Sequence, residues 1–486
     1  MAILYRCVFV CLVAVWGLLE NVQGKRTGFK ARITSNGINY ANKVAMDILA
    51  AKIRTFSVPD QHGKSDNVEY DLTNLRVTGF SEPGSNIVFL PGTGLRWAAN
   101  GAGISMNGDF HYKISIGLGW LPYIRGGGSF DISVYGLDFS INMNLGVDPD
   151  GRPSIAAAGC SCEISGVNID FHGGWAWLYN LFSGLLEAIL RSTLRGKICN
   201  SVTNQINEDG GKKLTTLQVT TQLGPNFVLD YRLIQAPSFQ SSYMETFHEG
   251  KISWLGDQTD APFEPLTMTD IGDTQKMMYL WISDYMFNTL GYAAQMHNYL
   301  VRNITAADLP PESRGILNTT CTPFACLGNL IPQLQKAYPN STVELDLFSG
   351  SLPTMTITPE DLKVLCSGKI VLYARQRNNN LACLMTLFAT METTANVSIA
   401  NELVYAKIDD MKLRLNVTDS AVGPFDSRFL QMLINNVLKV SLIPTINELG
   451  QKGFPLPVTG KIRFVNTSLR LVQHAIVIET DLNYRG

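Results

Sequence analysis

The sequence has few charged residues for its length. Only 16% of its 486 residues are Asp, Glu, Lys or Arg, whereas 45% are hydrophobic. The formal net charge is −2 and the pI about 6.3, so the composition does not indicate a nucleic-acid partner. Such a chain has more apolar surface to hide than two small cores ordinarily require. Elongated barrels with an apolar interior would hide that surface.

Motifs typical of enzymes are also missing. The chain has no Gly-x-Ser-x-Gly, His-Glu-x-x-His, Gly-rich phosphate loop or Cys-x-x-Cys motif. Its six histidines are scattered along the chain, and no setting for a nucleophile is visible. We therefore predict that the protein is not an enzyme and has no catalytic residues. A secreted lipase, the alternative, would release fatty acid from phospholipid vesicles.

The first 24 residues read as a secretory signal peptide. Arg6 is followed by an uncharged apolar run over residues 7–19, and Val22-Gln23-Gly24 supplies the small or aliphatic residues of a cleavage site. That run is shorter than the roughly 20 apolar residues of a membrane-spanning helix, a length that no other stretch of the chain approaches. We expect a secreted, soluble protein that begins near Lys25.

Hydrophobic periodicity occurs twice along the chain in the same order. Each half carries an amphipathic helix near its start and a second helix further on, with apolar residues three and four positions apart. A repeated unit of this kind indicates duplicated architecture. The four predicted helices are Asn36–Phe56 and Trp175–Ile206 in the first half, and Ser283–Leu300 and Asp426–Leu442 in the second.

Segments of alternating polar and apolar residues lie between these helices and predict strands. The fold class is therefore α+β. Length alone suggests about three domains of roughly 150 residues, whereas the duplication indicates two, over residues 25–249 and 277–486. Residues 250–276 hold acids, glycine and two prolines without periodicity, and we predict a linker there. The strands are predicted at Val68–Phe80, Ile104–Ile116, Phe130–Leu145, Ser154–Phe171, Val343–Leu347, Thr354–Thr358, Leu362–Ala374, Leu381–Met391, Glu402–Val417 and Gly460–Arg470.

Seven of the nine cysteines remain after the signal peptide is removed, because two of them lie in it. An oxidising compartment favours pairing, and an odd number cannot all pair within one chain. Cys160 and Cys162 share one face of a strand, so one of them should bond Cys199 and the other should stay free and buried. A metal site at Cys160-x-Cys162 lacks paired histidines. Three pairings are open for the last four: Cys321, Cys326, Cys366 and Cys383.

Six Asn-x-Ser/Thr sequons occur, and all lie in the second half. The secretory route glycosylates such sites on protein surfaces. Either chance or a first half kept bare for contact accounts for this one-sided distribution. The predicted glycosylation sites are Asn303, Asn318, Asn340, Asn396, Asn416 and Asn466.

Five strings in one order along the mature chain resemble the family of bactericidal/permeability-increasing protein and lipopolysaccharide-binding protein, to which the plasma phospholipid and cholesteryl ester transfer proteins also belong. The string that carries most of the resemblance is NELGQKGFPLP. The strings are GFKARITSNGINYA at the mature start, the run 160–199 with GWAWLYNLF, LWISDYMFNT at 280–289, VGPF at 422–425, and NELGQKGFPLP at 447–457.

The resemblance implies a boomerang of two barrels, each a twisted antiparallel sheet wrapped on two helices, joined by a central sheet. It also implies one apolar pocket per barrel for phospholipid acyl chains, without any other cofactor, and a single disulfide between Cys160 and Cys199. Helix faces rich in small and aliphatic residues can line a slot between helix and sheet, although the same residues can equally pack a closed core. The candidate pocket residues are Ile38, Ala41, Ala45, Ile48, Leu49, Leu178, Phe182, Leu185 and Ile189.

The expected tip of the first barrel is poor in basic residues. Relatives grip lipopolysaccharide through clustered lysine and arginine, which bond the phosphates of lipid A. The segment Asp109–Gly128, read as a loop, instead sets two bases among aromatic and aliphatic residues, as a prong entering a lipid surface would. Eight basic residues against two acidic ones over 25–64 still leave a local bias. The candidate tip residues are Lys52, Arg54, Lys64, Lys113, Trp120, Tyr123 and Arg125.

Two functions follow from these expectations. In the first, a monomeric innate immune factor binds lipopolysaccharide, phospholipid and the bacterial outer-membrane surface. In the second, the same pockets carry phospholipid or sterol ester between particles. String similarity favours the first, and the nearly neutral tip favours the second.

Overall fold

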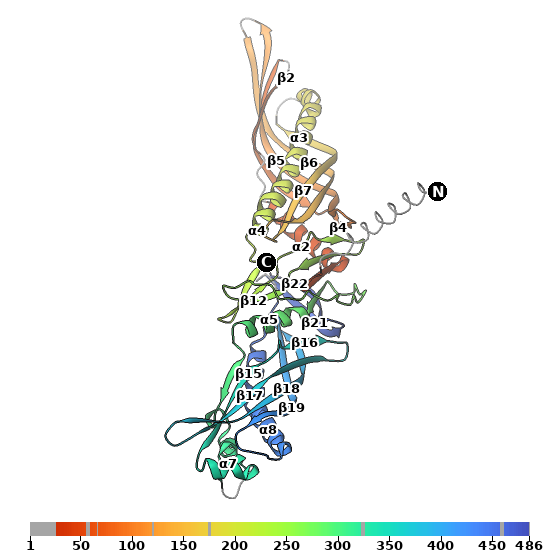
Figure 1. The fold of residues 1–486 in the computed structure, drawn as a ribbon. Coiled ribbons are helices and arrows are strands. Elements are labelled where there is room, and N and C mark those ends of the chain that lie inside the picture. The colour runs from red at the N-terminus through yellow and green to blue at the C-terminus, as the bar shows by residue number, and fades with distance from the viewer. Residues whose placement is uncertain are drawn as a thin grey trace, which may run out of the picture.

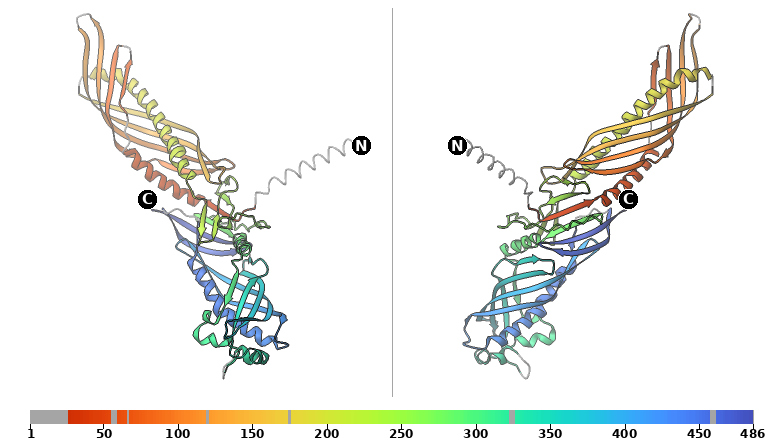
Figure 2. Two further views of the ribbon diagram at one scale, coloured as in Figure 1. Left: turned by 60° about the vertical axis from the view of Figure 1, so that its left-hand side comes forward. Right: turned by 90° about the vertical axis from the view of Figure 1, so that its right-hand side faces the viewer.

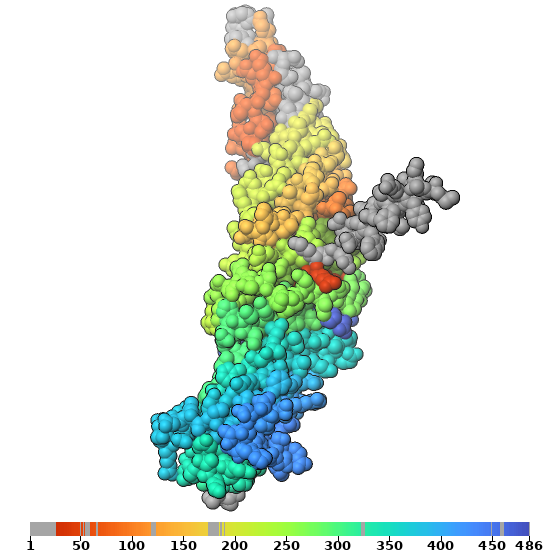
Figure 3. Space-filling model, in the orientation of Figure 1, coloured from red at the N-terminus to blue at the C-terminus, as the bar shows by residue number. Residues whose placement is uncertain are grey.

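The computed structural model describes residues 26–54, 59–65, 67–118, 121–173, 176–321, 326–456 and 461–485. The predicted signal peptide lies outside these residues. Figure 1 shows an elongated molecule in which two lobes of sheet and helix extend from a shared middle. Figure 2 shows the bend between the lobes, and Figure 3 the narrow overall outline. The architecture is the boomerang of two barrels.

A six-stranded antiparallel sheet joins the two barrels, and its strands come from the start, middle and end of the chain. Strand β1 pairs with β11 on one side and β13 on the other, and β13 pairs with β22. The apolar runs of β13 and β22 account for their burial on both faces. The strand order is β10 (Ser238–Phe239), β11 (Tyr243–His248), β1 (Phe29–Thr34), β13 (Met278–Ser283), β22 (Ala475–Tyr484) and β21 (Ile462–Val472).

The N-terminal barrel is an antiparallel sheet that curls around one face of a long helix, α3 (Ala176–Asn204). A shorter helix, α2 (Ser35–Arg54), packs against β4 and β3 near the middle of the molecule. Alternate residues of the long strands face inward and build one buried core with the later turns of α3. The strands are β2 (Gln61–Ser65), β3 (Val68–Ser81), β4 (Gly84–Leu90), β5 (Gly94–Leu118), β6 (Leu121–Val147) and β7 (Pro153–His172).

The C-terminal barrel repeats this plan around helix α8 (Ser427–Lys452), which begins at an Asp426 cap. Helix α5 (Asp284–Met296) occupies the place of α2, and the short helices α6 (Leu327–Leu330) and α7 (Pro332–Ala337) lie at the far end. The strands are β14 (Val301–Ile304), β15 (Thr342–Ser349), β16 (Thr354–Ile357), β17 (Leu362–Arg375), β18 (Leu381–Ala400), β19 (Leu403–Ser420) and β20 (Phe454–Pro455).

Short elements follow two of these helices and strands. A π-helical turn and helix α4 (Gly211–Thr215) follow α3, and two 3-10 helices over 306–308 and 311–317 follow β14 in the C-terminal barrel. A three-stranded sheet lies beside the central one. Its order is β12 (Lys251–Trp254), β9 (Phe227–Asp230) and β8 (Thr220–Leu223).

Helix α8 is long and apolar enough to cross a membrane by length and composition. The sequence-based statement that no stretch after the signal peptide approaches that length is therefore wrong. In the structure, however, Leu430, Ile434 and Val437 of this helix are almost fully buried against the sheet. The helix accordingly fills a barrel core, because its apolar face already has a partner within the fold.

The predicted linker, residues 250–276, is held against the central sheet. It begins with β12, and its later part is fixed by Arg32, which is 1% exposed. The Arg32 guanidinium donates to Glu245 at 2.8 and 3.0 Å, to Asp270 at 2.5 Å and to the carbonyl oxygen of Asp273 at 3.3 Å. Since a buried charge is costly unless paired, this cluster ties the segment to β1 and β11.

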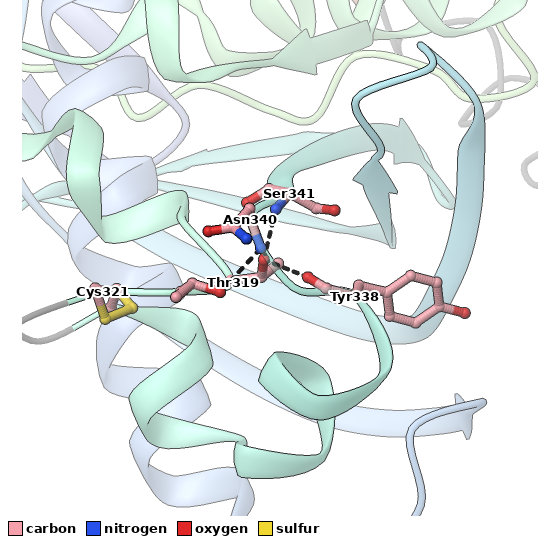
Figure 4. Close-up of a disulfide and its surroundings, with 7 residues drawn as sticks. Thr319, Cys321, Tyr338, Asn340 and Ser341 are labelled. Carbon is pink, nitrogen blue, oxygen red and sulfur yellow. Dashed lines mark hydrogen bonds between the residues drawn. A yellow bond between two sulfur atoms is a disulfide. The ribbon is translucent and has the colours of Figure 1, made fainter.

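Two disulfides are present in the described residues. Cys160 of β7 bonds Cys199 of α3, as the resemblance implied, and Cys162 is free and buried. A second disulfide joins Cys321 to Cys326 (Figure 4), so the expectation of a single disulfide is wrong, and none of the three complete pairings left open for the second half is formed. The other two cysteines of that half are free thiols on β17 and β18.

Candidate functional site

An apolar cavity lies between α3 and the sheet of the N-terminal barrel. Its empty space is about 700 Å³, counted to the open mouth, and the surface that it exposes is apolar. The lining residues are Ile53 of α2; Val77 and Phe80 of β3; Pro83; Ala102, Ile104 and Met106 of β5; Leu137 and Phe139 of β6; and Leu194, Ile198, Ser201 and Val202 of α3.

The periodicity of each element explains this lining. In β5 every second residue faces inward, which brings Ala102, Ile104 and Met106 to one side. In α3 a spacing of four places Leu194 and Ile198 on one face. Because every methylene moved from water into such a cavity contributes roughly 0.8 kcal/mol, a hydrocarbon chain is a suitable occupant.

The disulfide between Cys160 and Cys199 lies beside this cavity. Cys199 follows the lining residue Ile198, and the bond ties α3 to β7 with a Cα–Cα distance of 5.7 Å. It therefore limits how far the helix can move from the sheet. Burial raises the pKa of the neighbouring Cys162 thiol, which keeps it protonated and poorly suited to nucleophilic or metal-binding chemistry.

Four of the helix residues predicted to line the pocket have described side chains, and none of these four is in the cavity lining. Ile38 packs in a separate buried cluster between β4 and the central sheet, Ala45 is half-buried, and Ala41 and Ile48 are exposed. Among the described side chains of α2, that of Ile53 in the last turn lines the cavity. The side chains of the other five predicted residues lie outside the described part: Leu49, Leu178, Phe182, Leu185 and Ile189.

The sequence analysis reads the segment Asp109–Gly128 as a loop, and this prediction is wrong. Strands β5 and β6 stay paired as far as Leu118 and Leu121, so the segment is the end of a long hairpin. In Figure 1 this hairpin extends beyond the rest of the N-terminal barrel. Trp120 lies outside the described residues, as do the side chains of Lys52 and Arg54.

Four charged residues form one transverse row across this end of the sheet. In strand register, Lys64 of β2 faces Glu69 of β3, Glu69 faces Lys113 of β5, and Lys113 faces Arg125 of β6. Lys113 Nζ lies 3.1 Å from the Glu69 carboxylate and 4.1 Å from the centre of the Tyr123 ring. Lys64 Nζ approaches the same carboxylate at 3.7 Å. The structure thus brings four predicted tip residues together.

Glu69 is the member of this row that sequence reasoning missed. Its hydrogen bond to Lys113 holds the carboxyl pKa below its ordinary value, so Glu69 is charged at neutral pH. It offsets one of the three cations, which leaves a net positive row with exposed Arg125 at one end. Because Glu69 lies far from the predicted segment Asp109–Gly128 in the sequence, its pairing with Lys113 has no sequence signal until the strand register is known.

The opposite face of the hairpin is aliphatic. Ile114 is buried in the barrel core, whereas Ile116 and Ile124, nearer the turn, are 39% and 37% exposed. Successive residues of a strand point to opposite faces, so the hairpin end presents cations and Tyr123 on one side and isoleucines on the other. This arrangement matches the boundary between phosphate headgroups and acyl chains.

A second cavity of about 400 Å³ lies where β12 meets α5. Trp254 stacks on His297 with ring centres 4.5 Å apart, and His297 contacts Asp257 at 3.0 Å. The lining is mixed in polarity, so it suits an acyl chain less well than the first cavity does. No group of three or more His, Cys, Asp or Glu residues placed to hold a metal ion occurs in the described ranges.

Comparison with known proteins gives one consistent result. Residues 37–211 match the N-terminal domain model of the LBP / BPI / CETP family, and residues 221–484 match its C-terminal domain model. The chain is 28% identical over 484 residues to the bactericidal permeability-increasing protein of Sebastes schlegelii, which covers 99% of this chain and 100% of that one.

Two further similarities support the same grouping. The lipopolysaccharide-binding protein of Bos taurus is 27% identical over 466 residues, with 95% of this chain and 94% of that protein covered. A crystal structure of lipopolysaccharide binding protein superposes with a TM-score of 0.62 at 27% identity, covering 94% of this chain and 99% of that one. The similarity therefore extends over both barrels.

Proposed function

The chain belongs to the LBP / BPI / CETP family, and from that premise we propose that it is a secreted lipid-binding protein of innate immunity that binds lipopolysaccharide. Two similar chains carry the names bactericidal permeability-increasing protein and lipopolysaccharide-binding protein. The observation that carries the proposal is the apolar cavity in the same barrel as an amphipathic, positively charged hairpin end.

These two features divide the ligand between them. The cavity takes acyl chains, a bound phospholipid among them, because its exposed surface is apolar. At the hairpin end, Lys113 and Arg125 donate charge-assisted hydrogen bonds to the phosphates of lipid A, while Ile116 and Ile124 enter the acyl layer of the outer membrane. Binding needs no bond to be broken, and we propose no enzymatic activity.

Secretion and modification complete the proposal. Residues 1–24 direct the chain to the secretory route and are removed, and the mature monomer has barrels over 25–249 and 277–486 joined by 250–276. Disulfides such as Cys160–Cys199 persist in that oxidising compartment. Five of the six sequon asparagines are exposed, and Asn318 is half-buried.

Lipid transfer between particles is the second candidate, and Glu69 is the observation that favours it. The carboxylate accepts from Lys113 and lies near Lys64, so part of the positive charge at the hairpin end is already satisfied within the protein. A carrier of phospholipid or sterol ester needs the cavity and has no need of a strong anion clamp.

The deciding experiment measures binding of the purified mature protein to lipopolysaccharide and to phosphatidylcholine vesicles across a salt series. Lipopolysaccharide binding that weakens as salt rises supports the immune function, because salt screens exposed charges. Binding to phosphatidylcholine alone, with no salt dependence, would replace that function by lipid transfer. Release of free fatty acid from the vesicles would overturn both.

A paired substitution locates the contact. Lys113→Gln together with Arg125→Gln should lower lipopolysaccharide affinity about tenfold, since a hydrogen bond to a charged group contributes about 1.5–3 kcal/mol and exposure reduces it. Lys412→Gln, which removes an exposed lysine from β19 of the other barrel, is the matched control and should leave affinity unchanged. Equal affinity in all three proteins would place the contact elsewhere.

A further inference from the structure

A row of exposed apolar side chains crosses the outer face of the C-terminal barrel. In strand register, Val301 of β14 faces Phe348 of β15, Phe348 faces Lys369 of β17, Lys369 faces Phe388 of β18, and Phe388 faces Asn416 of β19. Val301, Phe348 and Phe388 are 48%, 38% and 47% exposed. Three large apolar side chains thus lie open to solvent in one line across four strands.

The backbone fixes this orientation. The neighbours of Phe388 along β18, Leu387 and Ala389, are 0% and 7% exposed in the core around α8. Because successive side chains of a strand alternate between faces, Phe388 must point outward. Phe348 keeps the same face through its pairing with Lys369. Large apolar side chains gathered on one exposed face usually mark a surface that something covers.

The residue that ends the row is a glycosylation sequon, Asn416-Val417-Thr418. Asn416 is exposed and directly opposite Phe388 in the antiparallel pair, where Cβ atoms lie about 4.5–5.5 Å apart. At the other edge of the sheet, Asn303 of a second sequon stands two residues from Val301 on the same face. Both ends of the row therefore carry an attachment point for sugar.

We propose that an N-linked oligosaccharide on Asn416 lies over Phe388 and closes the outer face of the C-terminal barrel. This inference rests on the proposed secretion, since only that route supplies the sugar. A bond forms between Asn416 Nδ2 and the anomeric carbon of an oligosaccharide carried on a polyprenyl diphosphate. The lipid diphosphate leaves, and the amide nitrogen loses one proton.

Tethering makes the attached sugar the favoured occupant. A covalently linked group meets Phe388 at a high effective concentration, whereas a second protein or a vesicle must first pay the cost of association. The C–H faces of a pyranose ring cover an aromatic ring, while the hydroxyl groups keep the outer surface polar. Lys369, between the two phenylalanines, disfavours a continuous apolar interface between protein copies.

The test uses full-length protein secreted from a eukaryotic cell line. Mass spectrometry of glycopeptides determines occupancy at each sequon, and hydroxyl-radical footprinting measures the oxidation rate of Phe388. Thr418→Ala and Asn416→Gln each remove the sequon, one while keeping the asparagine and the other while keeping the threonine. We expect Asn416 to be occupied and Phe388 oxidation to rise at least about threefold in both variants.

The matched control is Ser468→Ala, which removes the sequon at Asn466 of β21. No large apolar side chain of β21 or β22 is among the strongly exposed ones in the described residues. Phe388 oxidation should be unchanged in this variant, so a general effect of losing one glycan is separated from coverage of the row.

The outcomes are distinguishable from failure of the proposed function. A protein that is retained in the cell, or secreted with every sequon empty, contradicts secretion through the glycosylating route and this inference with it. Occupancy at other sequons with Asn416 empty overturns the inference alone. A Phe388 oxidation rate that stays the same when the glycan is lost also overturns the inference. Sedimentation of the protein as a dimer would then identify a second copy of the chain as the cover.

Discussion

The two barrels share one plan and differ in how it is filled. Each sheet curls around a long helix, α3 in the first barrel and α8 in the second. Beside α3 the interior leaves an apolar cavity that is open to solvent, with small residues such as Ala102 and Ser201 in its lining. Along α8, Leu430, Ile434 and Val437 are at most 1% exposed.

The ends of the two barrels that lie farthest from the central sheet also differ, because one is capped by helices and the other is not. Helices α6 and α7 cap the end of the C-terminal barrel with Leu327, Ile331 and Leu334, which are all at most 1% exposed. At the corresponding end of the N-terminal barrel, Ile116 and Ile124 of the hairpin remain exposed. In the described residues, the first barrel therefore has an apolar cavity and exposed isoleucines at its far end, whereas the far end of the second barrel is covered by buried helix residues.

The largest expected difference between the two barrels is in the free energy of unfolding that each loses when its disulfide is removed. The Cys160–Cys199 bond spans 39 residues and the Cys321–Cys326 bond spans 5. Loop-closure entropy predicts a loss of about 4 kcal/mol for the first and about 2 kcal/mol for the second. Urea denaturation of the two double Cys→Ala variants, followed by circular dichroism, measures both losses.

The difference between the two losses is the informative quantity. Each variant removes both cysteines, so no new free thiol complicates the comparison. The single-residue variant Cys383→Ala, which removes an exposed thiol without a disulfide, controls for cysteine substitution itself. Equal losses for both disulfides would show that the long loop is already ordered in the unfolded chain.

Acid should loosen the joint between the barrels, where His248 of β11 lies. Its Nδ1 donates to the carbonyl oxygen of Tyr231 at 2.7 Å, so Nε2 is left to accept from the Thr246 hydroxyl at 2.8 Å. Burial of this neutral ring lowers the pKa of His248 to about 4. The unfolded chain, with an ordinary pKa near 6.5, binds a proton that the folded protein does not.

The free energy of unfolding should therefore fall as the pH drops from about 6.5 to about 4, by up to about 3 kcal/mol. His248→Gln should remove this dependence, whereas His62→Gln, at an exposed histidine, should retain it. Hydrogen exchange at pH 5 should show faster exchange in β11 than in β18. If the pH dependence of the free energy of unfolding remains in His248→Gln, another titratable group is its cause.

Filling the cavity should empty the first barrel of lipid. Val77→Trp places a larger side chain in the lining, while Val88→Trp changes an exposed valine of β4 outside it. Displacing two methylene groups at about 0.8 kcal/mol each lowers affinity more than tenfold. Mass spectrometry of the organic extract should show about a tenth of the phospholipid in the first variant and the full amount in the second.

An unchanged phospholipid load in Val77→Trp would show that the lipid binds at another site, for example in the second barrel. A reduced load in both variants would point to a general loss of structure. Thermal unfolding of the two proteins distinguishes that case, because an exposed substitution such as Val88→Trp should be close to neutral in stability.

Helical periodicity predicted all four main helices, because their apolar faces are continuous over many turns. Helix α8 runs ten residues past its predicted end at Leu442, since Pro444 within it reads as a stop. Strands β1 and β22 were not predicted. Both are buried in the central sheet, where alternation is weak because the two faces are covered.

The site was less predictable than the fold, because it depends on pairing between distant strands. Three of the predicted tip cations, Lys64, Lys113 and Arg125, lie in one row, and Glu69 joins them only through the registers of β2, β3 and β5. Ile53 and Leu194, which line the cavity, are not among the predicted helix residues. Amphipathic pattern identifies the inward face of a helix, and the depth of the space depends on the facing strands.

The smallest expected effect concerns this overlooked carboxylate. Glu69→Gln keeps the side-chain shape and removes the charge that Lys113 and Lys64 share, so both cations become available to phosphate. We expect lipopolysaccharide affinity to rise about threefold at low salt and the salt dependence to steepen, as more exposed charge takes part in binding. Titration of lipopolysaccharide at two ionic strengths measures both quantities.

The matched control for that change lies in the other barrel, where Glu392 of β18 faces Lys412 of β19 in the same antiparallel arrangement. Glu392→Gln should not alter affinity, because that lobe presents its charge away from the proposed contact. A fall in affinity for Glu69→Gln would mean that Glu69 orients Lys113 and Tyr123 for the ligand. Equal increases in affinity in both variants would mean that only the net charge of the protein matters, and not the position of the charge at the hairpin end. The functional contrast between the two barrels would then rest on the cavity.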